Sequence, residues 1–300
     1  MSLIVLGTVA LDHIKTPSGV RQDILGGSAA HFSMAARLFT KVNLVAVVGK
    51  DFPKKYIAFL HRKGINLTSL KIGEGKTFRW HGEYKKEDFN TALTLATELG
   101  VLSGFAPYVT HAERDIPNIF LANIDPDIQH GLLKLMRSPQ LVGVDSMNLW
   151  INHKRKSLVK LLKEVHLFVA NDSEARMLSK ENNLIKAAKA LRNMGPRLVV
   201  IKKGEHGVFF YSDRLRFSFP AYPVEKVIDP TGAGDTFAGG LMGYLSKERR
   251  ITEKTLKRAV IYATTLASFN VEGFGIQKTA SLTMPMVNRR TKELLKFISY

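Results

Sequence analysis

Cysteine is absent from the 300 residues, which excludes a disulfide framework, a thiolate metal site and a cysteine nucleophile. Acidic residues are scarce beside basic ones, since 26 Asp and Glu against 44 Lys and Arg give a net charge of +18. Such a charge is compatible with a nucleic-acid partner. The basic residues are dispersed, however, with no basic tail and only short clusters such as Lys154–Lys156. We therefore expect a protein that handles small anionic ligands rather than nucleic acid.

Long apolar runs are also missing. No stretch of about 20 consecutive apolar residues occurs, so no membrane-spanning helix is expected. The first twelve residues carry no basic segment, and Asp12 interrupts their apolar pattern, which is not typical of a signal peptide. We expect a cytoplasmic protein. Because no Pro- or Gly-rich linker divides the chain, residues 1–300 are predicted to form a single domain, and any second lobe would be inserted into it.

Short apolar runs alternate with helical patterns along the chain. Many of these runs are apolar at successive positions, which predicts a mostly parallel sheet buried on both faces. The alternation predicts a doubly wound α/β fold with helices on both faces of the sheet. The predicted strands are Leu3–Leu6, Asn43–Val48, Ile119–Ile124, Leu141–Asp145, Leu167–Asn171, Leu198–Lys202 and Val208–Tyr211. The predicted helices are Ala29–Phe39, Lys54–Lys63, Ser157–Val165, Asp172–Leu178, Leu184–Met194, Asp235–Leu245, Glu253–Phe269 and Met286–Ile298.

Two segments do not fit this alternation. Residues 10–25 are polar and turn-rich around Pro17 and Gly19. Residues 77–84 alternate between apolar and polar side chains, which predicts a half-exposed antiparallel strand with Phe78, Trp80 and Tyr84 on one face. Together with Asn90–Leu99, the two segments predict a small accessory sheet outside the main layers.

The most informative local pattern is the glycine-rich string from Asp229 to Gly243. Gly232, Ala233 and Gly234 precede a helical pattern and carry almost no side chains, so their backbone N–H groups at a helix N-terminus predict an anion site. Asp235 follows directly. A carboxylate there is suited to take a proton from an attacking hydroxyl group, although a short polar residue at this position is also typical of a helix cap.

This string resembles the second signature of the ribokinase/PfkB family of carbohydrate kinases, and residues 26–39 resemble the first signature. The resemblance extends from Gly7 to Gly275. It implies a ribokinase-like fold with a small β-sheet lid, formed by about residues 10–25 and 77–108. It also implies ATP-dependent phosphorylation of a hydroxyl group on a sugar or sugar-like small molecule, with Mg²⁺ as a cofactor.

In this family Asp235 would be the general base, beside the anion hole of Gly232, Ala233 and Gly234. A helix N-terminus is expected to lower the pKa of Asp235. A weak base nevertheless suffices, because positioning and charge neutralisation dominate phosphoryl transfer. The resemblance also assigns substrate binding to four residues, namely Asp12, Gly26, Gly27 and His31. His31 stands where the family usually has Asn, which leaves the usual sugar assignment open.

The resemblance further implies an ATP and metal site. Asn171 and Glu174 match an Asn-x-x-Glu motif, in which Glu174 would hold Mg²⁺ through water, although the same residues are typical of a helix cap with Asp172 at the helix start. Further nucleotide contacts are implied for Lys202, Gly204 and Gly275. Two more residues, Asp229 and Thr231, match positions that bind a monovalent cation, K⁺, in some members. Polar residues also end predicted strands, where ligands of α/β proteins gather, namely Asn123, Asp125, Asp145 and Asn148.

Several alternatives stay open at this level. The substrate is expected to be a sugar, or alternatively a nucleoside, which an aromatic lid and His31 would accommodate. A non-catalytic ligand sensor on the same fold and a nucleic-acid-binding protein are alternatives of other classes. The aromatic face of the lid would form the core of the lid or a homodimer contact, or else Arg79 or His81 on the opposite face would contact the substrate.

Overall fold

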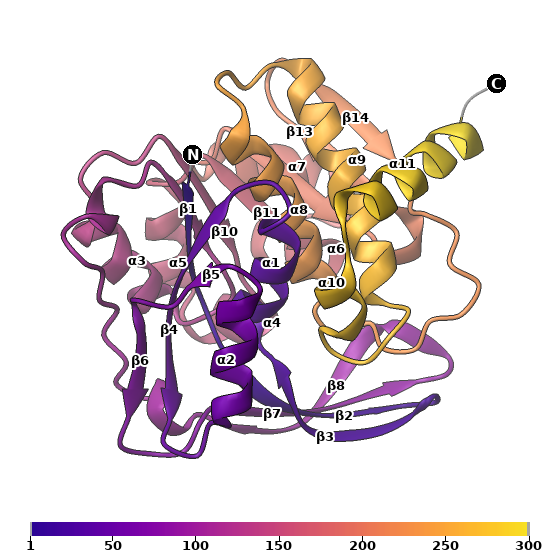
Figure 1. Ribbon diagram of the computed structural model, residues 1–300. Coiled ribbons are helices and arrows are strands. Elements are labelled where there is room, and N and C mark those ends of the chain that lie inside the picture. Colours follow the sequence, from indigo (N-terminus) through magenta and orange to yellow (C-terminus); the bar gives the residue numbers. More distant parts are fainter. Residues whose placement is uncertain (1, 299–300) are drawn as a thin grey trace.

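A large sheet runs through the computed structural model, which describes residues 2–298 (Figure 1). Its strands are β1 (Ser2–Leu6), β4 (Lys41–Gly49), β5 (Ile65–Asn66), β6 (Leu70–Gly73), β9 (Asn118–Leu121), β10 (Leu141–Asp145), β11 (Leu167–Asn171), β12 (Leu198–Lys202), β13 (Val208–Tyr211) and β14 (Arg216–Phe219). The order is β14-β13-β12-β11-β10-β9-β1-β4-β5, with β6 also paired to β4. The pairs from β12 through β5 are parallel, and β13 and β14 extend one edge in antiparallel fashion. The predicted mostly parallel sheet is confirmed.

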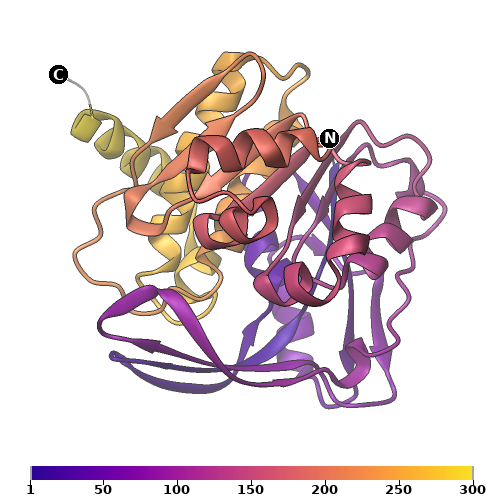
Figure 2. The same cartoon turned by 180° about the vertical axis from the view of Figure 1, so that it is seen from behind.

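Successive residues of the central strands are buried on opposite faces of this sheet. In β1, Leu3 and Val5 belong to one hydrophobic cluster, and Ile4 and Leu6 belong to the other. The first cluster is covered by α1 (Ser28–Ala36), α2 (Lys54–Arg62), α8 (Ala233–Lys247) and α9 (Glu253–Asn270). The second is covered by α3 (Pro126–Leu135), α5 (Arg155–Leu162), α6 (Asp172–Ser179) and α7 (Leu184–Asn193), seen from behind in Figure 2. The apolar runs therefore reflect burial on both faces.

The remaining helices and several boundaries differ from the predictions. Helix α3 is not among the predicted helices, although Asp125 caps it and Pro126 occupies its first turn, a combination typical of a helix start. Helices α4 (Asn148–His153) and α10 (Gln277–Ser281) and the first two residues of α11 (Met284–Ile298) are also unpredicted. Strand β9 ends three residues before the predicted Ile124. Helix α1 ends at Ala36 because residues 38 and 39 make the shorter i→i−3 hydrogen bonds of a tight turn.

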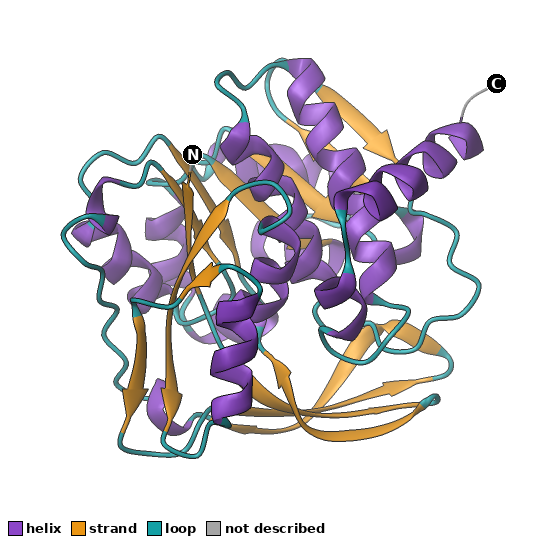
Figure 3. Ribbon diagram, in the orientation of Figure 1, coloured by secondary structure: helices purple, strands orange, loops and turns teal. Residues whose placement is uncertain are grey.

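A second sheet, the lid sheet, lies across the carboxyl ends of the central strands (Figure 3). It consists of β2 (Ala10–Thr16), β3 (Gly19–Gly26), β7 (Arg79–Lys85) and β8 (Asp88–Glu98) in the order β3-β2-β7-β8. Strand β7 is antiparallel to β8, as its alternation suggests, but it is parallel to β2. The predicted accessory sheet is therefore present, and it faces the strand ends where ligands gather in α/β folds.

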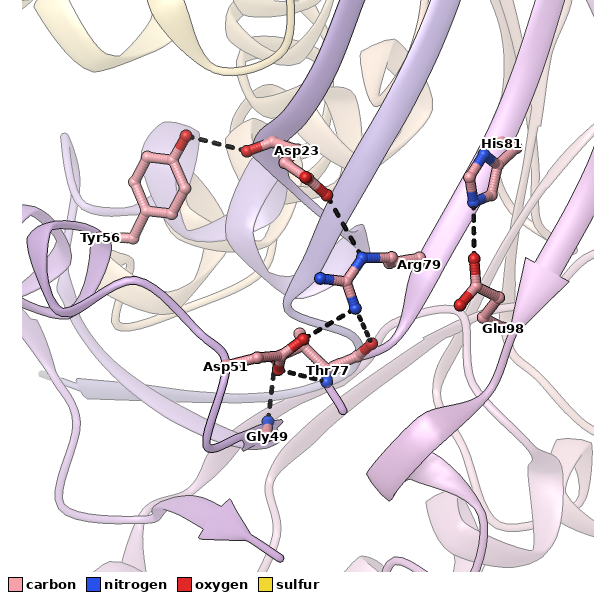
Figure 4. Close-up of polar contacts among 8 residues, drawn as sticks. All are labelled: Asp23, Gly49, Asp51, Tyr56, Thr77, Arg79, His81 and Glu98. Carbon is pink, nitrogen blue, oxygen red and sulfur yellow. Dashed lines mark hydrogen bonds and ion pairs between the residues drawn. The ribbon is translucent and has the colours of Figure 1, made fainter. Parts of the chain in front are cut away.

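Ion pairs and hydrogen bonds connect one end of the lid sheet to the layers around the main sheet (Figure 4). The Arg79 guanidinium lies 2.8 Å from Asp51 Oδ2 and 3.2 Å from Asp23 Oδ1. The other oxygen of Asp51 accepts hydrogen bonds from the backbone and the hydroxyl of Thr77, each at 2.7 Å. Tyr56 on α2 donates to the carbonyl of Asp23 at 3.1 Å. Arg79 therefore connects β3 and β7 to the loop that precedes α2.

The two faces of the lid sheet carry different chemistry. Asp12 on β2 is in register with Trp80 on β7, so the two side chains lie on the same face, and Tyr84 lies on that face four residues after Trp80. His13 and His81 are in register on the opposite face, where their rings stack with centroids 5.3 Å apart. Arg79 and His81 therefore point away from the Asp12 face. The homodimer contact through the lid stays a prediction. None of the helices within residues 2–298 has the length and apolar character needed to cross a membrane.

Candidate active site

The glycine-rich string forms the start of α8. Gly232 is the N-cap residue with φ of +72°, a left-handed conformation that favours glycine, and a side chain there would meet the His31 ring at 2.2 Å. Helix α8 therefore begins at Ala233, two residues before the predicted start. A Cβ at Gly234 would lie 2.8 Å from Lys202 Nζ, so the absence of a side chain lets this ammonium group approach the helix N-terminus. The Ala233 N–H already donates to the Pro230 carbonyl oxygen at 3.1 Å.

Three carboxylates surround one lysine beside this helix start. Lys202, the last residue of β12, places Nζ 3.0 Å from Oδ2 of Asp145, which ends β10. Burial, reinforced by the charge of Asp145, raises the pKa of Asp235 to about 7, and Lys202 opposes the rise. Burial and Asp145 likewise raise the pKa of Glu174 to about 7. The expectation of a lowered pKa at Asp235 is therefore wrong: desolvation outweighs both the Lys202 charge and the backbone hydrogen bond at the helix start, which lower it.

Asn171 and Glu174 form a capping box at the start of α6. The Asn171 side chain accepts from the Glu174 backbone, and Glu174 Oε2 accepts from the Asn171 backbone, both at 2.7 Å. The capping interpretation is thus correct: Asn171 is the cap, Asp172 starts the helix, and Glu174 lies in the first turn. Because the box occupies one carboxylate oxygen of Glu174, a role toward a ligand would rest on the other.

The charge balance of this cluster fits a divalent cation. Asp145, Glu174 and Asp235 face Lys202, so three carboxylates share one ammonium group. Within residues 2–298, no group of three or more His, Cys, Asp or Glu side chains is arranged to hold a metal ion directly. Mg²⁺ is commonly held by one or two carboxylates together with phosphate oxygens and water. The donor set therefore fits an ion that arrives with a nucleotide. Glu174 would hold it through the carboxylate oxygen that the capping box leaves free, whereas both oxygens of Asp145 are already engaged by Ser146 and Lys202.

Asp12 lies on β2 of the lid sheet, close enough to Asp229 and Asp235 to feel their charges. Its side chain is buried, and a Cβ at Gly26 would lie 1.8 Å from Asp12 Oδ2, so only glycine leaves room for this carboxylate. Burial raises the pKa of Asp12 to about 8; a hydrogen bond from the Gly27 backbone opposes the rise, and the charges of Asp229 and Asp235 add to it. The predicted substrate residues Asp12, Gly26 and Gly27 are therefore brought together with Asp235.

His31 belongs to a buried network around Asn270. The Asn270 amide donates to the Thr231 carbonyl at 2.7 Å, which fixes its orientation, and its oxygen accepts from Thr236 Oγ1 at 2.9 Å. His31 Nδ1 lies 3.1 Å from the same oxygen and so must donate to it. Burial lowers the pKa of His31, which keeps the ring neutral. Its Nε2 is therefore an acceptor, and it is buried without a hydrogen-bond partner.

Asp229 joins two loops rather than standing free. Its Oδ1 accepts from the Thr231 backbone at 2.9 Å, and its Oδ2 accepts from the Gly275 backbone at 2.8 Å. Gly275 also packs against Ile24 of the lid sheet. The K⁺ site at Asp229 and Thr231 stays a prediction, as does the contact of Gly275 with the nucleotide. Gly204 lies close to Asn90 of β8, so the lid sheet reaches over this loop, and the contact of Gly204 with a nucleotide stays a prediction.

The contacts of three residues of the site could not be predicted from the sequence. Asp145 is noticed as a strand end, but its ion pair with Lys202 depends on the neighbouring position of β10 and β12 across β11. Tyr84 is buried with its hydroxyl 3.5 Å from Thr231 Oγ1. Asn270, fully buried at the end of α9, begins the segment 270–275 that resembles the family's nucleotide loop, but nothing in its local sequence predicts its contact with His31. Its place is visible only once α9 packs against α8.

The raised pKa values predict how the stability of the ligand-free protein depends on pH. A carboxyl whose pKa rises from 3.8 to about 8 on folding, as at Asp12, binds its proton more tightly in the folded state. Its contribution is therefore full below pH 4 and is lost as the pH rises toward 8. We expect the thermal midpoint to fall as the pH rises from about 4 to about 8, and Asp12→Asn to flatten this fall. A wild-type midpoint that rises over this range would contradict the burial of Asp12.

A hydroxyl group held at Asp12 would lie near Asp235 and the side-chain-free start of α8. The Lys202 ammonium group beside it could stabilise negative charge that develops there. These are the requirements for transferring a phosphoryl group to an alcohol, and the chain is a phosphotransferase of this class. The family described as pfkB family carbohydrate kinase matches residues 5–283, so the chain belongs to that family.

The comparisons with individual proteins agree with this family. The chain is 32% identical over 260 residues to a cytidine kinase of Thermococcus kodakarensis, covering 84% of this chain and 91% of the relative. It is 28% identical to a nucleoside kinase of Methanothermobacter thermautotrophicus, covering 97% and 96%. A solved Escherichia coli protein described as a ribokinase II, in complex with ATP and Mg²⁺, has a TM-score of 0.81 at 16% identity, covering 97% and 99%. The predicted ribokinase-like fold and kinase class are confirmed.

Proposed function

We propose that this protein is an ATP-dependent nucleoside kinase that phosphorylates a ribose hydroxyl group, with cytidine as the first candidate substrate. The observation that carries the proposal is the 32% identity to a cytidine kinase over most of both chains. It favours the nucleoside alternative over the sugar substrate that was the main expectation from the sequence. The aromatic residues on the Asp12 face of the lid sheet support the same choice.

In this proposal, substrate binding begins at Asp12. Its carboxylate accepts hydrogen bonds from the ribose hydroxyl groups, and Gly26 and Gly27 allow the sugar to approach the backbone. His31 Nε2, a neutral acceptor without a protein partner, accepts a further hydroxyl. An Asn at this position could both accept and donate hydrogen bonds to the substrate, whereas His31 Nε2 can only accept.

Asp235 then takes the proton of the reacting hydroxyl as the bond to phosphorus forms. Its raised pKa makes it a stronger base than an exposed carboxylate. The N–H groups of Gly232 and Gly234 at the start of α8, together with the Lys202 ammonium group, stabilise the negative charge of the transferred phosphoryl group, whereas the Ala233 N–H is already bonded to Pro230. When bound, Mg²⁺ supplies charge neutralisation at the phosphates. Closure of the lid sheet excludes water from the site, so that transfer to water is suppressed.

A substrate panel tests the proposal. We expect ADP release with Mg-ATP to be at least about tenfold more efficient, in kcat/KM, with cytidine or another nucleoside than with ribose or fructose. Formation of the nucleoside monophosphate, measured by chromatography, identifies the product. Efficient turnover of a free sugar and none of a nucleoside would instead identify a sugar kinase. Nucleotide binding by calorimetry without turnover on any panel member would favour the non-catalytic sensor.

A further inference from the structure

The inner face of the lid sheet carries an indole that lies flat along its own strand. A Cβ at Gly82 would meet the benzo ring of Trp80, at 1.9 Å from Cη2 and 2.4 Å from Cζ2. Glycine at position 82 therefore lets the ring cover the strand instead of standing away from it. The indole N–H donates to Thr94 Oγ1 on β8 at 3.2 Å, which fixes the ring within the lid sheet. One face of the ring is thus against the strand, and the side chain remains partly exposed.

The position of this ring relative to the site residues is set by strand register. Trp80 is paired with Asp12 across β2 and β7, so the indole lies beside the carboxylate that faces Asp235. Tyr84, four residues further along β7, places its hydroxyl near Thr231, next to the start of α8. At about 3.3 Å per residue, Tyr84 and Trp80 are roughly 13 Å apart along the strand. On this face of the lid sheet, Tyr84 therefore lies beside the start of α8, where the phosphoryl group would be transferred, and the flat indole of Trp80 lies beside Asp12.

We propose that Trp80 is the surface on which the base of the nucleoside stacks, and that Gly82 is required to hold the indole in that position. The inference rests on the proposed nucleoside kinase function and adds the residue that contacts the base. Because the only hydrogen-bonding group of the indole is used by Thr94, Trp80 contacts the base through its ring face alone. Stacking on Trp80 therefore strengthens the binding of any nucleoside relative to a free sugar, and it does not distinguish one base from another.

Kinetics provide the first test. Base–aromatic stacking predicts that Trp80→Leu raises KM for cytidine about 10- to 100-fold with a smaller change in kcat. KM for ATP stays the same, and the slow turnover of free ribose is unaffected. Trp80→Phe keeps an aromatic face and restores most of the affinity. A loss of equal size for cytidine and ribose would overturn the inference, because it would show that Trp80 supports the lid rather than the base.

Fluorescence provides a second test that does not depend on turnover. The chain has two tryptophans, Trp80 and Trp150, so Trp150→Phe leaves Trp80 as the only indole, and Trp80→Phe leaves Trp150. Cytidine is expected to quench the emission of Trp150→Phe, whereas ribose does not, and Trp80→Phe shows no cytidine-dependent change. Gly82→Ala in the Trp150→Phe background weakens the quenching.

The outcomes separate the inference from the function on which it rests. If the wild type phosphorylates cytidine but Trp80 emission does not respond to it, the stacking role is wrong and the nucleoside kinase function stands. If calorimetry detects no binding of any nucleoside while ribose is turned over, both are wrong. If cytidine quenches Trp150 rather than Trp80, the base lies near α4 instead of under the lid sheet.

Discussion

Asp235→Asn is expected to lower kcat about 10²–10⁴-fold while leaving KM for ATP nearly unchanged. The amide has the size of the carboxylate, so the start of α8 keeps its packing, but it cannot take a proton from the reacting hydroxyl. Because the pKa of Asp235 in the ligand-free protein is raised to about 7, wild-type kcat/KM should rise with pH through this region as Asp235 loses its proton. The variant should lose that limb of the profile. Steady-state ADP release between pH 5.5 and 9 measures both effects.

A matched substitution separates this effect from a general one. Asp213→Asn makes the same chemical change at an exposed carboxylate that pairs with Arg192 on the surface, and it should leave kcat and the pH profile unaltered. Calorimetric titration with ATP should give wild-type affinity for both variants. If Asp235→Asn retains more than about a tenth of the wild-type kcat, proton removal by Asp235 is not required, and positioning by the helix N-terminus carries the reaction.

The sequence is informative about the fold where the signal is local. The run Leu141–Asp145 is apolar until its last residue and is a strand over the same five residues, because a strand buried on both faces has no exposed positions. Helix α3 was missed because its amphipathic pattern is short, with only Pro126, Gln129 and Leu132 buried. The parallel pairing of β2 with β7 joins residues more than sixty positions apart, and nothing in either segment specifies its partner.

Some residues of the candidate site could likewise be predicted from local sequence, and others only from packing. Gly232, Gly234 and Asp235 are contiguous, so one string of residues carries the anion hole and the base together. Asp145 and Asn270 acquire their contacts only through packing, the first with Lys202 and the second with His31. The pKa of Asp235 also could not be predicted from its place at a helix start, because the raising effect comes from burial beneath other elements.

His31, which stands where the resemblance leads one to expect Asn, is accommodated by specific contacts in the core. Its ring occupies the space above Gly232, and Asn270 holds it through Nδ1. The amide of Asn270 in turn contacts Thr231 and Thr236, on either side of the bare helix start. The network therefore connects the residue predicted to bind substrate with the backbone predicted to receive the phosphoryl group. The sequence shows the exchange of Asn for His31, but only the packing shows that Gly232 leaves room for the ring and that Asn270 bonds to it.

Lys202→Met is expected to lower both stability and activity. The substitution preserves much of the side-chain volume but leaves Asp145, whose side chain is 5% exposed, without its ion-pair partner. Removing one member of a buried pair typically costs about 3–5 kcal/mol. The loss should be largest above pH 8 and should shrink below pH 6, because protonation of Glu174 and Asp235, each with a pKa of about 7, reduces the negative charge left behind. Thermal denaturation at several pH values measures this dependence.

A second substitution separates the structural role of Lys202 from its proposed role at the phosphates. Lys202→Met/Asp145→Asn removes the unpaired charge, so it should recover much of the lost stability without recovering kcat/KM. The neighbouring Lys203→Met is the matched control and should stay within about 0.5 kcal/mol of wild type. If activity returns together with stability in the double variant, Lys202 acts only on folding and does not meet the phosphoryl group. If the single variant is as stable as Lys203→Met at pH 8, the pair with Asp145 contributes nothing, and the carboxylates must be neutralised by protonation instead.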